Sequence, residues 1–341
     1  VYFSKLRATA LLLSHTPISM FLRGDLHKLH LYCGYSIFVF STSHTAMHLA
    51  RWYDQGNLWN LLLHHFTGRT GFTLWFTCLL ICVPMMFQCL KRNIPYEIRK
   101  SILHYFFLVF AGALCFHVKA RGYLPNGGFA PYIMGTLLAW YFLDATYCFF
   151  CMTEKIETTK FHVLPTGVQM TMGVSEAFQN KGAQGGYCYV CLPWISRHQW
   201  HAFSLFENPL NPMERQIFMQ KGGDWTTKVH QTLQRDTVRP VWVQGPFPSP
   251  YDSAGDYDNQ ILVASGIGIT PALSVIRAHQ NTRRINLVWA VRDPHLLRFF
   301  LQHLYLDHRG WNLIFYTGKE ELGHDIEIFS NTNVCIIRGR P

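Results

Sequence analysis

The sequence predicts a multi-domain membrane protein, in which an all-α bundle of transmembrane helices precedes a soluble half made of an antiparallel β-barrel and an α/β domain. Only 15% of the 341 residues are charged, well below the roughly 25% of soluble domains. Most of the long apolar runs approach the ~20 residues that a helix needs to cross a bilayer. These runs cover residues 8–22, 31–50, 70–90, 101–117 and 131–151. No such run recurs after about residue 153, so the soluble half is expected to begin there.

The net charge of +10 does not indicate a nucleic-acid partner, because basic residues gather in two links between apolar runs. The basic residues of these links are Arg23, Lys28, Lys91, Arg92, Arg99 and Lys100. Under the positive-inside rule both links face the cytosol. Alternating crossings then leave the soluble half in the cytosol as well. We therefore expect a lipid bilayer as the partner surface and no nucleic acid.

Two apolar segments each begin and end with histidine. His30 and His44 are 14 residues apart, and His104 and His117 are 13 apart, which is roughly 20 Å along a helix. Ionisable residues inside a membrane usually face a partner or a cavity, and neutral imidazole is a common ligand of haem iron. Two helices with matched histidines can therefore hold two haems at two levels. For any single histidine, a hydrogen-bonded structural role is the alternative.

The direction of the two helices decides which histidines pair. If both run outward from the cytosol, His30 pairs with His104 at the inner level and His44 with His117 at the outer level. His48 follows in "HTAMH" and is a candidate to line a cavity beside the outer haem. The alternative for His48 is a polar residue at the level of the lipid headgroups.

The soluble half shows two further patterns. Segments such as "KFHVLPTGVQMTMGV" and "GGYCYVCLPW" alternate like the strands of a small antiparallel barrel. In "NQILVASGIGITPALSVIRAH" an apolar strand at Ile261–Ala264 precedes Gly266, Gly268 and a helical pattern. A helix N-terminus with free backbone N–H groups can bind a phosphate. The full G-x-G-x-x-G pattern is absent, so a packing turn is the alternative.

Together these pieces resemble the NADPH oxidase and ferric reductase superfamily, and more closely the NADPH oxidases. The resemblance covers roughly residues 20–341, and the histidine spacings are those of the oxidase branch. The matching segments are "HAFSL", "GGDWT", "GPFPSP", "GIGITP", "VWAVRD" and the terminal "GRP". The resemblance implies a transmembrane haem domain at 1–152, an FAD-binding barrel at 153–252 and an NADPH-binding α/β domain at 253–341. The last two would form a ferredoxin-reductase-like cytosolic module.

The resemblance also assigns residues by position. It implies that the flavin is held by His201, Phe203 and Ser204, and the NADPH pyrophosphate by Gly266, Gly268, Thr270 and Pro271. Arg292 is a candidate for the 2′-phosphate because a guanidinium suits bidentate phosphate binding. The sequence departs from the family pattern at four positions: Ser204 replaces threonine, Ala202 replaces proline, and Gln220 and Lys221 lie where an arginine often meets the FAD diphosphate.

The implied activity carries electrons from NADPH through FAD and two haems b to molecular oxygen, which becomes superoxide outside the cell. Arg7 and His48 would stabilise superoxide, although Arg7 rests on a partial match of "RATA" and a plain helix-end arginine is its alternative. The expected location is the plasma membrane, with the flavin and nucleotide domains in the cytosol. A ferric-chelate reductase of the same fold is one alternative, and a non-catalytic haem-binding membrane scaffold is another.

Two family segments are not seen, namely the first transmembrane helix and the C-terminal cysteine-glycine segment. The sequence is therefore expected to be part of a longer chain. Regulatory or accessory subunits are compatible with the resemblance but cannot be read from the sequence.

Overall fold

The computed structural model describes most of the chain and forms two compact units. The described residues are 5–14, 16, 26–117, 130–180, 185–208, 211–279, 281–301, 310–322 and 334–339. The first unit is Asp25–Thr146 with Val1–Arg7, and the second is Tyr147–Pro341 with Ala8–Gly24. Each unit is described separately below.

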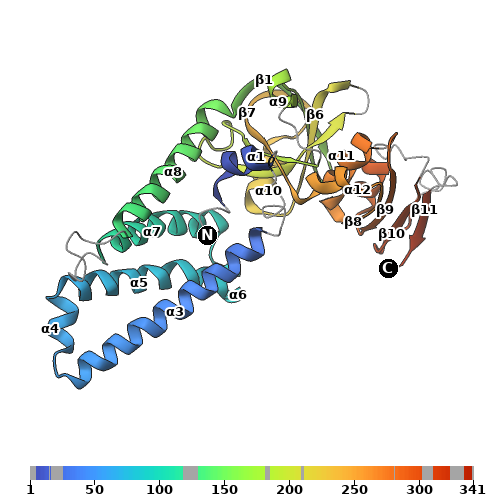
Figure 1. Ribbon diagram of the computed structural model, residues 1–341. Coiled ribbons are helices and arrows are strands. Elements are labelled where there is room, and N and C mark those ends of the chain that lie inside the picture. Colours follow the sequence, from blue (N-terminus) through green and yellow to red (C-terminus); the bar gives the residue numbers. More distant parts are fainter. Residues whose placement is uncertain are drawn as a thin grey trace. The chain divides into compact units, whose positions relative to one another are not determined.

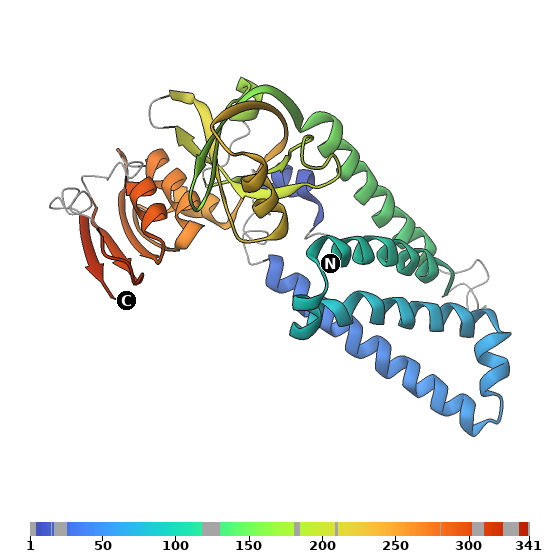
Figure 2. The ribbon, with the colours of Figure 1, turned by 180° about the vertical axis from the view of Figure 1, so that it is seen from behind.

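The first unit is helical (Figures 1 and 2). Its elements are α3 (Leu26–Asp54), α4 (Leu58–Leu63), α5 (Phe66–Met86), α6 (Gln88–Asn93), α7 (Tyr96–His117) and most of α8 (Ala130–Cys151). α5 packs along α7 and also contacts α3 and α4. α5 is therefore the central helix through which α3 and α7 are positioned.

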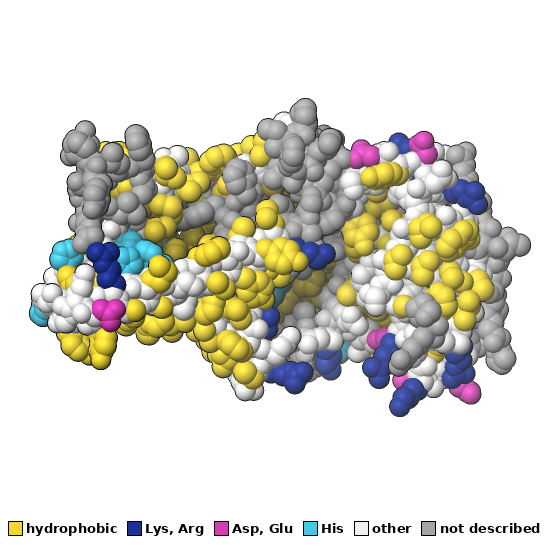
Figure 3. Space-filling view, turned by 60° about the horizontal axis from the view of Figure 1, so that its bottom comes forward, with side chains coloured by type: hydrophobic (Ala, Val, Ile, Leu, Met, Phe, Trp, Pro, Cys, Tyr) yellow, Lys and Arg dark blue, Asp and Glu magenta, His cyan; other side chains and the backbone are white. Residues whose placement is uncertain are grey.

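Three described helical segments are long and apolar enough to cross a membrane: Phe66–Met86, Glu97–His117 and Pro131–Cys151. Many of their large apolar side chains are exposed, including Leu143 at 69% and Phe150 at 75%. Figure 3 shows hydrophobic side chains over much of the visible face of the helical unit. Apolar side chains exposed along whole helices require an apolar surrounding such as lipid. The predicted transmembrane runs at 101–117 and 131–151 are thus confirmed as parts of helices of spanning length. The run at 70–90 is confirmed only to Met86, where α5 ends before the extended residue Phe87.

The two remaining runs differ from these three. The run at 31–50 lies inside α3, which has 29 residues but is less apolar because histidines interrupt it. The run at 8–22 is described only in part, as α1 (Arg7–Ser14). Ala8 of α1 is buried with Cys148 and Met152, where α8 leads into the second unit.

The second unit begins with an antiparallel sheet in the order β4-β3-β7-β1-β2-β6-β5. Its strands are β1 (Thr153–Leu164), β2 (Gly167–Gly173), β3 (Tyr187–Cys191), β4 (His201–Ser204), β5 (Phe206–Asn208), β6 (Asn211–Gln220) and β7 (Thr237–Phe247). β4 lies near β6, so the sheet curls toward a barrel. Alternate residues such as Met170, Val190 and Val243 fill its interior. Two helices accompany the sheet, α9 (Glu176–Asn180) and α10 (Asp224–Thr232).

A parallel sheet follows, in the order β11-β10-β9-β8. Its strands are β8 (Asn259–Ser265), β9 (Arg284–Val291), β10 (Asn312–Tyr316) and β11 (Val334–Arg338). The helical elements around it are η3 (Pro250–Asp256), η4 (Gly266–Gly268), α11 (Ile269–His279) and α12 (Pro294–Leu301). Side chains of α11 and α12, such as Ile276 and Phe300, are buried with Trp289 and Ile314 of the sheet. Membrane helices, an antiparallel barrel-like sheet and an α/β sheet in this order confirm the predicted fold class.

Candidate functional site

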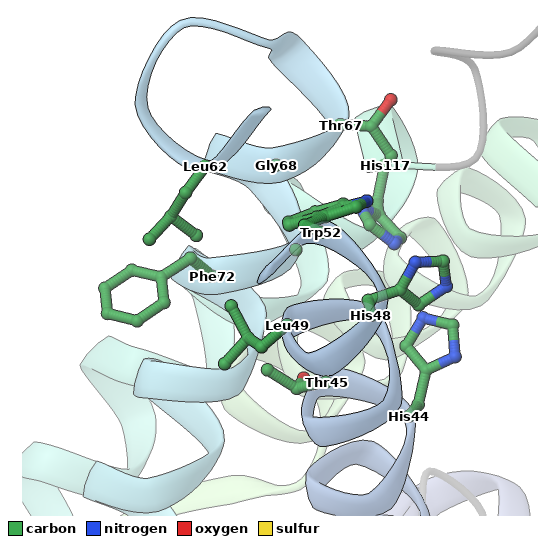
Figure 4. A pocket seen from close by; sticks show the side chains of 11 residues that line it. His44, Thr45, His48, Leu49, Trp52, Leu62, Thr67, Gly68, Phe72 and His117 are labelled. Carbon is green, nitrogen blue, oxygen red and sulfur yellow. The ribbon is translucent and has the colours of Figure 1, made fainter. Parts of the chain in front are cut away.

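Histidines from α3 and α7 meet at a pocket in the helical unit. The ring centroids of His44 and His117 are 6.5 Å apart, with an angle of 81° between the planes. His48 lies beside His44, with centroids 4.6 Å apart, and Trp52 follows at 5.6 Å from His48. Figure 4 shows His44 and His48 on the same side of α3, with the His117 ring next to them. The structure therefore brings together three histidines that the sequence assigned to the outer level.

The pocket has a volume of ≈ 130 Å³. It is lined by His44, Thr45, His48, Leu49, Trp52, Leu62, Thr67, Gly68, Gly71, Phe72 and His117. These residues come from α3, α4, α5 and α7, so α5 supplies the wall between the two histidine-bearing helices. Most of the lining is apolar, and the imidazoles are its main polar groups.

Both histidines of α7 have their Nδ1 atom in a hydrogen bond. His104 Nδ1 lies 2.7 Å from the carbonyl oxygen of Lys100, and His117 Nδ1 lies 3.0 Å from Thr70 Oγ1. A carbonyl can only accept, so neutral His104 carries its proton on Nδ1 and leaves the lone pair on Nε2. Metal-ligating histidines characteristically hold their second ring nitrogen in such a bond. The α7 histidines therefore have the arrangement of metal ligands.

The geometry of the outer histidines fits a haem. Two imidazoles on opposite sides of one metal ion, with metal–nitrogen bonds of about 2.0 Å, have centroids roughly 6 Å apart. The His44–His117 separation of 6.5 Å matches this value. A haem needs only two axial ligands from the protein, and His44 and His117 offer two imidazoles.

The other predicted residues of this region are placed as follows. His30 is half-buried on α3 and His104 is exposed on α7, and their pairing stays a prediction. Arg7 begins α1 and is not among the described residues that line the pocket with His48. The arrangement therefore gives no support to a joint role of Arg7 and His48 in stabilising superoxide. That role stays a prediction.

The predicted flavin residues lie on β4 beside α10. His201 stacks on Trp225, with centroids 4.1 Å apart and planes 28° apart, and Phe203 lies 6.0 Å from Trp225. Ser204 pairs with Tyr187 of β3 and, by strand alternation, points to the opposite face from Phe203. The segments "HAFSL" and "GGDWT" are thus brought into contact. They form an aromatic surface of the kind against which a flat ring system can pack.

The start of α10 is fixed by Thr226. Its Oγ1 accepts hydrogen bonds from the N–H groups of Gly223 (3.0 Å) and Gly222 (3.2 Å). Gln220 ends β6, and Lys221 is exposed directly after it. The position of the missing family arginine is therefore occupied by one neutral residue and one exposed cation.

The predicted pyrophosphate turn is formed by η4 between β8 and α11. Gly266 has a φ of +51°, a conformation that glycine adopts without strain. Its carbonyl oxygen accepts a hydrogen bond from Trp289 Nε1 at 2.9 Å. A Cβ atom added at Gly266 or Gly268 would meet nothing within 4 Å. The backbone of the turn is therefore open to a ligand, as the sequence predicts.

The other residues assigned to this site have different surroundings. Thr270 is buried, and its hydroxyl donates to the carbonyl oxygen of Ile267 at 3.0 Å. Pro271 is buried as well, so both residues support the turn from the protein interior. Arg292 is exposed just after β9. Because Ser265 pairs with Ala290 in parallel register, Gly266 and Arg292 follow neighbouring strand ends at one edge of the sheet.

Several contacting residues were missed in the sequence. Thr70 and Gly71 touch His117 from a helix 47 and 46 residues away (117 − 70 and 117 − 71), and a local pattern cannot reveal such a contact. Trp225 belongs to a quoted segment, yet its stacking on His201 depends on how α10 returns to β4. Trp52 lies four residues after His48, one helical turn away, and this spacing on α3 was the one available signal.

Comparison with known proteins gives a consistent result. Residues 257–341 match the ferric reductase NAD-binding domain family. A superoxide-generating NADPH oxidase heavy chain of Dictyostelium discoideum is 24% identical over 317 residues, covering 79% of this chain and 43% of that protein. Ferric reduction oxidase 8 of Arabidopsis thaliana is 35% identical over 125 residues, covering 32% of this chain and 17% of that protein. NADPH oxidase 1 of Mus musculus is 26% identical over 201 residues, covering 54% of this chain and 32% of that protein.

The chain spans less than half the length of each of these curated relatives. A solved flavohemoglobin structure from Malassezia yamatoensis aligns with a TM-score of 0.42 and 16% identity, over 70% of this chain and 66% of that one. Apolar helices followed by a barrel-like sheet and an NAD-binding α/β domain define a membrane protein with a nucleotide-binding reductase half. Residues 257–341 thus form a ferric reductase NAD-binding domain, and the chain as a whole is similar to NADPH oxidases and ferric reduction oxidases.

Proposed function

We propose that this protein is a transmembrane NADPH oxidase that moves electrons from cytosolic NADPH to oxygen outside the cell and releases superoxide. The observation that carries the proposal is the meeting of His44 and His117 at a separation suited to one iron, with His48 beside them. In the proposed orientation this pocket lies at the outer side of the plasma membrane. The flavin and nucleotide domains are then cytosolic.

The proposed cofactors are two haems b, FAD and NADPH. NADPH delivers two electrons as a hydride, a flavin passes them on one at a time, and haem iron accepts them singly. His30 and His104 would hold the inner haem, and His44 and His117 the outer one. His201, Phe203 and Ser204 would hold the flavin, with Trp225 supporting His201 from behind. Gly266 and Gly268 would admit the pyrophosphate, and Arg292 would meet the 2′-phosphate.

His44 and His117, the proposed ligands of the outer haem, themselves line this pocket, so its space is where that haem would sit. In this proposal oxygen, a small molecule, collects an electron at the edge of the outer haem, whereas a bulky ferric chelate would have to react from outside. His48 lies within the lining, where an imidazole can stabilise a developing negative charge.

A ferric-chelate reductase is the second candidate, because plant ferric reduction oxidases resemble this chain about as closely as the oxidases do. The deciding experiment measures NADPH-dependent cytochrome c reduction by the purified protein, with and without superoxide dismutase. An oxidase loses most of this activity when dismutase is added. Dismutase-insensitive activity that saturates with ferric citrate under nitrogen would establish the reductase instead.

A further inference from the structure

The hydrogen bond between Thr70 and His117 joins two helices at the candidate haem site. Thr70 lies on α5 and His117 ends α7, and their Oγ1 and Nδ1 atoms are 3.0 Å apart. The next residue on α5 is Gly71. A Cβ atom there would lie 2.9 Å from His117 Cε1, closer than real contacts allow. Two residues of α5 therefore contact the His117 imidazole. The Thr70 hydroxyl forms a hydrogen bond with it, and Gly71, which has no side chain, leaves room for the ring.

The direction of this hydrogen bond follows from the other neighbours of Thr70. Its Oγ1 lies 2.9 Å from the carbonyl oxygen of Phe66 and 3.2 Å from that of Thr67. Both carbonyls can only accept, and a hydroxyl has one proton to donate. Inside helices a threonine hydroxyl commonly gives this proton to a carbonyl one turn back. Its oxygen then accepts from His117, which in this arrangement carries its proton on Nδ1.

We propose that Thr70 is a positioning residue for the outer haem. Its hydroxyl fixes the Nδ1–H tautomer and the ring orientation of His117, so that Nε2 faces the iron. This inference rests on the proposed function, because it requires a haem at His44 and His117. An acceptor at Nδ1 also makes the imidazole a stronger electron donor. Thr70 would therefore stabilise the ferric form and lower the midpoint potential of the outer haem, while the inner haem, whose His104 is bonded within α7, would be independent of it.

The experiment is a redox titration of the purified full-length protein, followed by haem absorbance, with haem content measured as the pyridine complex. Thr70→Val removes the acceptor at nearly constant volume. We expect two haems to remain and one midpoint to rise, with up to a tenfold change in the oxidised-to-reduced ratio at fixed potential, which is about 59 mV for one electron. Thr70→Ser should restore the wild-type value.

Thr73→Val is the matched control, because Thr73 lies one turn further along α5 and its hydroxyl donates to the carbonyl oxygen of Arg69 within the same helix. It should leave both midpoints unchanged. Unchanged midpoints in Thr70→Val, with two haems bound, would overturn the inference while leaving the proposed function intact. A wild-type protein without haem would overturn both. If Thr70→Val does not accumulate, Thr70→Ala removes the same hydroxyl and is read in the same way.

Gly71→Ala gives an independent test of the same contact. The added methyl group must displace the His117 ring, so the ferric low-spin signal of one haem should weaken or shift in electron paramagnetic resonance. Gly112→Ala on α7 is its control, because a Cβ there meets nothing within 4 Å. An unaltered signal in Gly71→Ala would show that His117 does not depend on α5.

Discussion

The imidazole of His201 lies nearly flat on the indole of Trp225, with centroids 4.1 Å apart. This contact joins β4 to the start of α10 and gives the candidate flavin segment a rigid support. An aromatic pair of this kind contributes about 0.5–1.5 kcal/mol beyond its buried area. The support is independent of any bound flavin, so it can be tested by substitution at Trp225 alone.

Trp225→Leu should weaken FAD binding by roughly two- to tenfold, the equivalent of the lost aromatic contact. Flavin fluorescence of the purified protein, titrated with FAD, measures the change. Trp194→Leu is the matched control, because Trp194 packs on Phe161 elsewhere in the barrel. Both variants should lose stability, but only Trp225→Leu should lose FAD. Equal FAD affinity in the two variants would remove Trp225 from the flavin site.

The four helix histidines give a prediction on haem content. His104→Ala and His117→Ala should each cost one haem per chain, because each would remove one of two axial ligands. FAD content should stay unchanged, since the flavin segment lies in the other unit. His65→Ala, at an exposed histidine before α5, should keep both haems. Two haems retained in both His104→Ala and His117→Ala would refute the ligand assignment.

Arg292 is expected to select NADPH over NADH. Only NADPH carries a 2′-phosphate, and loss of a charge-assisted hydrogen bond costs about 1.5–3 kcal/mol. Arg292→Ala should therefore raise the KM for NADPH by roughly 10- to 150-fold and leave that for NADH nearly unchanged. Arg284→Ala is the control, because Arg284 is exposed at the opposite end of β9. Equal losses for both nucleotides would indicate a structural role of Arg292.

The sequence predicted those features that depend on local pattern. The length and hydropathy of the runs predicted the helices, and the spacing of the helix histidines placed His44 and His117 at one level, where their rings meet. The shared level of His30 and His104 stays a prediction. Strand, glycines and helix in "ILVASGIGITP" predicted the turn that η4 forms. Each of these signals lies within one element or at one junction, where periodicity and turn chemistry act directly.

Contacts between distant elements could not be predicted in this way. Thr70 reaches His117 because α5 packs along α7, and nothing in a threonine within an apolar run distinguishes it from a helix-bonded neighbour such as Thr73. The inward position of Thr270 was also missed. The family resemblance assigned Thr270 to the pyrophosphate turn, which stays a prediction, and the structure adds that its hydroxyl donates to the carbonyl oxygen of Ile267.

The two glycines of the turn should respond differently to alanine. Gly266→Ala forces a side chain into left-handed backbone, since φ is +51°, and should cost about 1–2 kcal/mol of folding stability. Gly268 has no positive φ, so Gly268→Ala should keep stability and instead hinder the approach of the pyrophosphate. Thermal unfolding and the KM for NADPH separate the two effects. A KM unchanged in Gly268→Ala would place the pyrophosphate elsewhere.

His48 provides the last test, which concerns the acceptor. It lines the pocket beside His44, and in the proposed mechanism its imidazole stabilises superoxide as charge develops. His48→Leu should keep both haem absorption bands and slow dismutase-sensitive cytochrome c reduction by roughly tenfold, which corresponds to about 1.4 kcal/mol of transition-state stabilisation. His64→Leu, at an exposed histidine that follows α4 outside the pocket lining, should keep the wild-type rate. If both variants match the wild type, His48 is a headgroup-level residue and oxygen is reduced without its help.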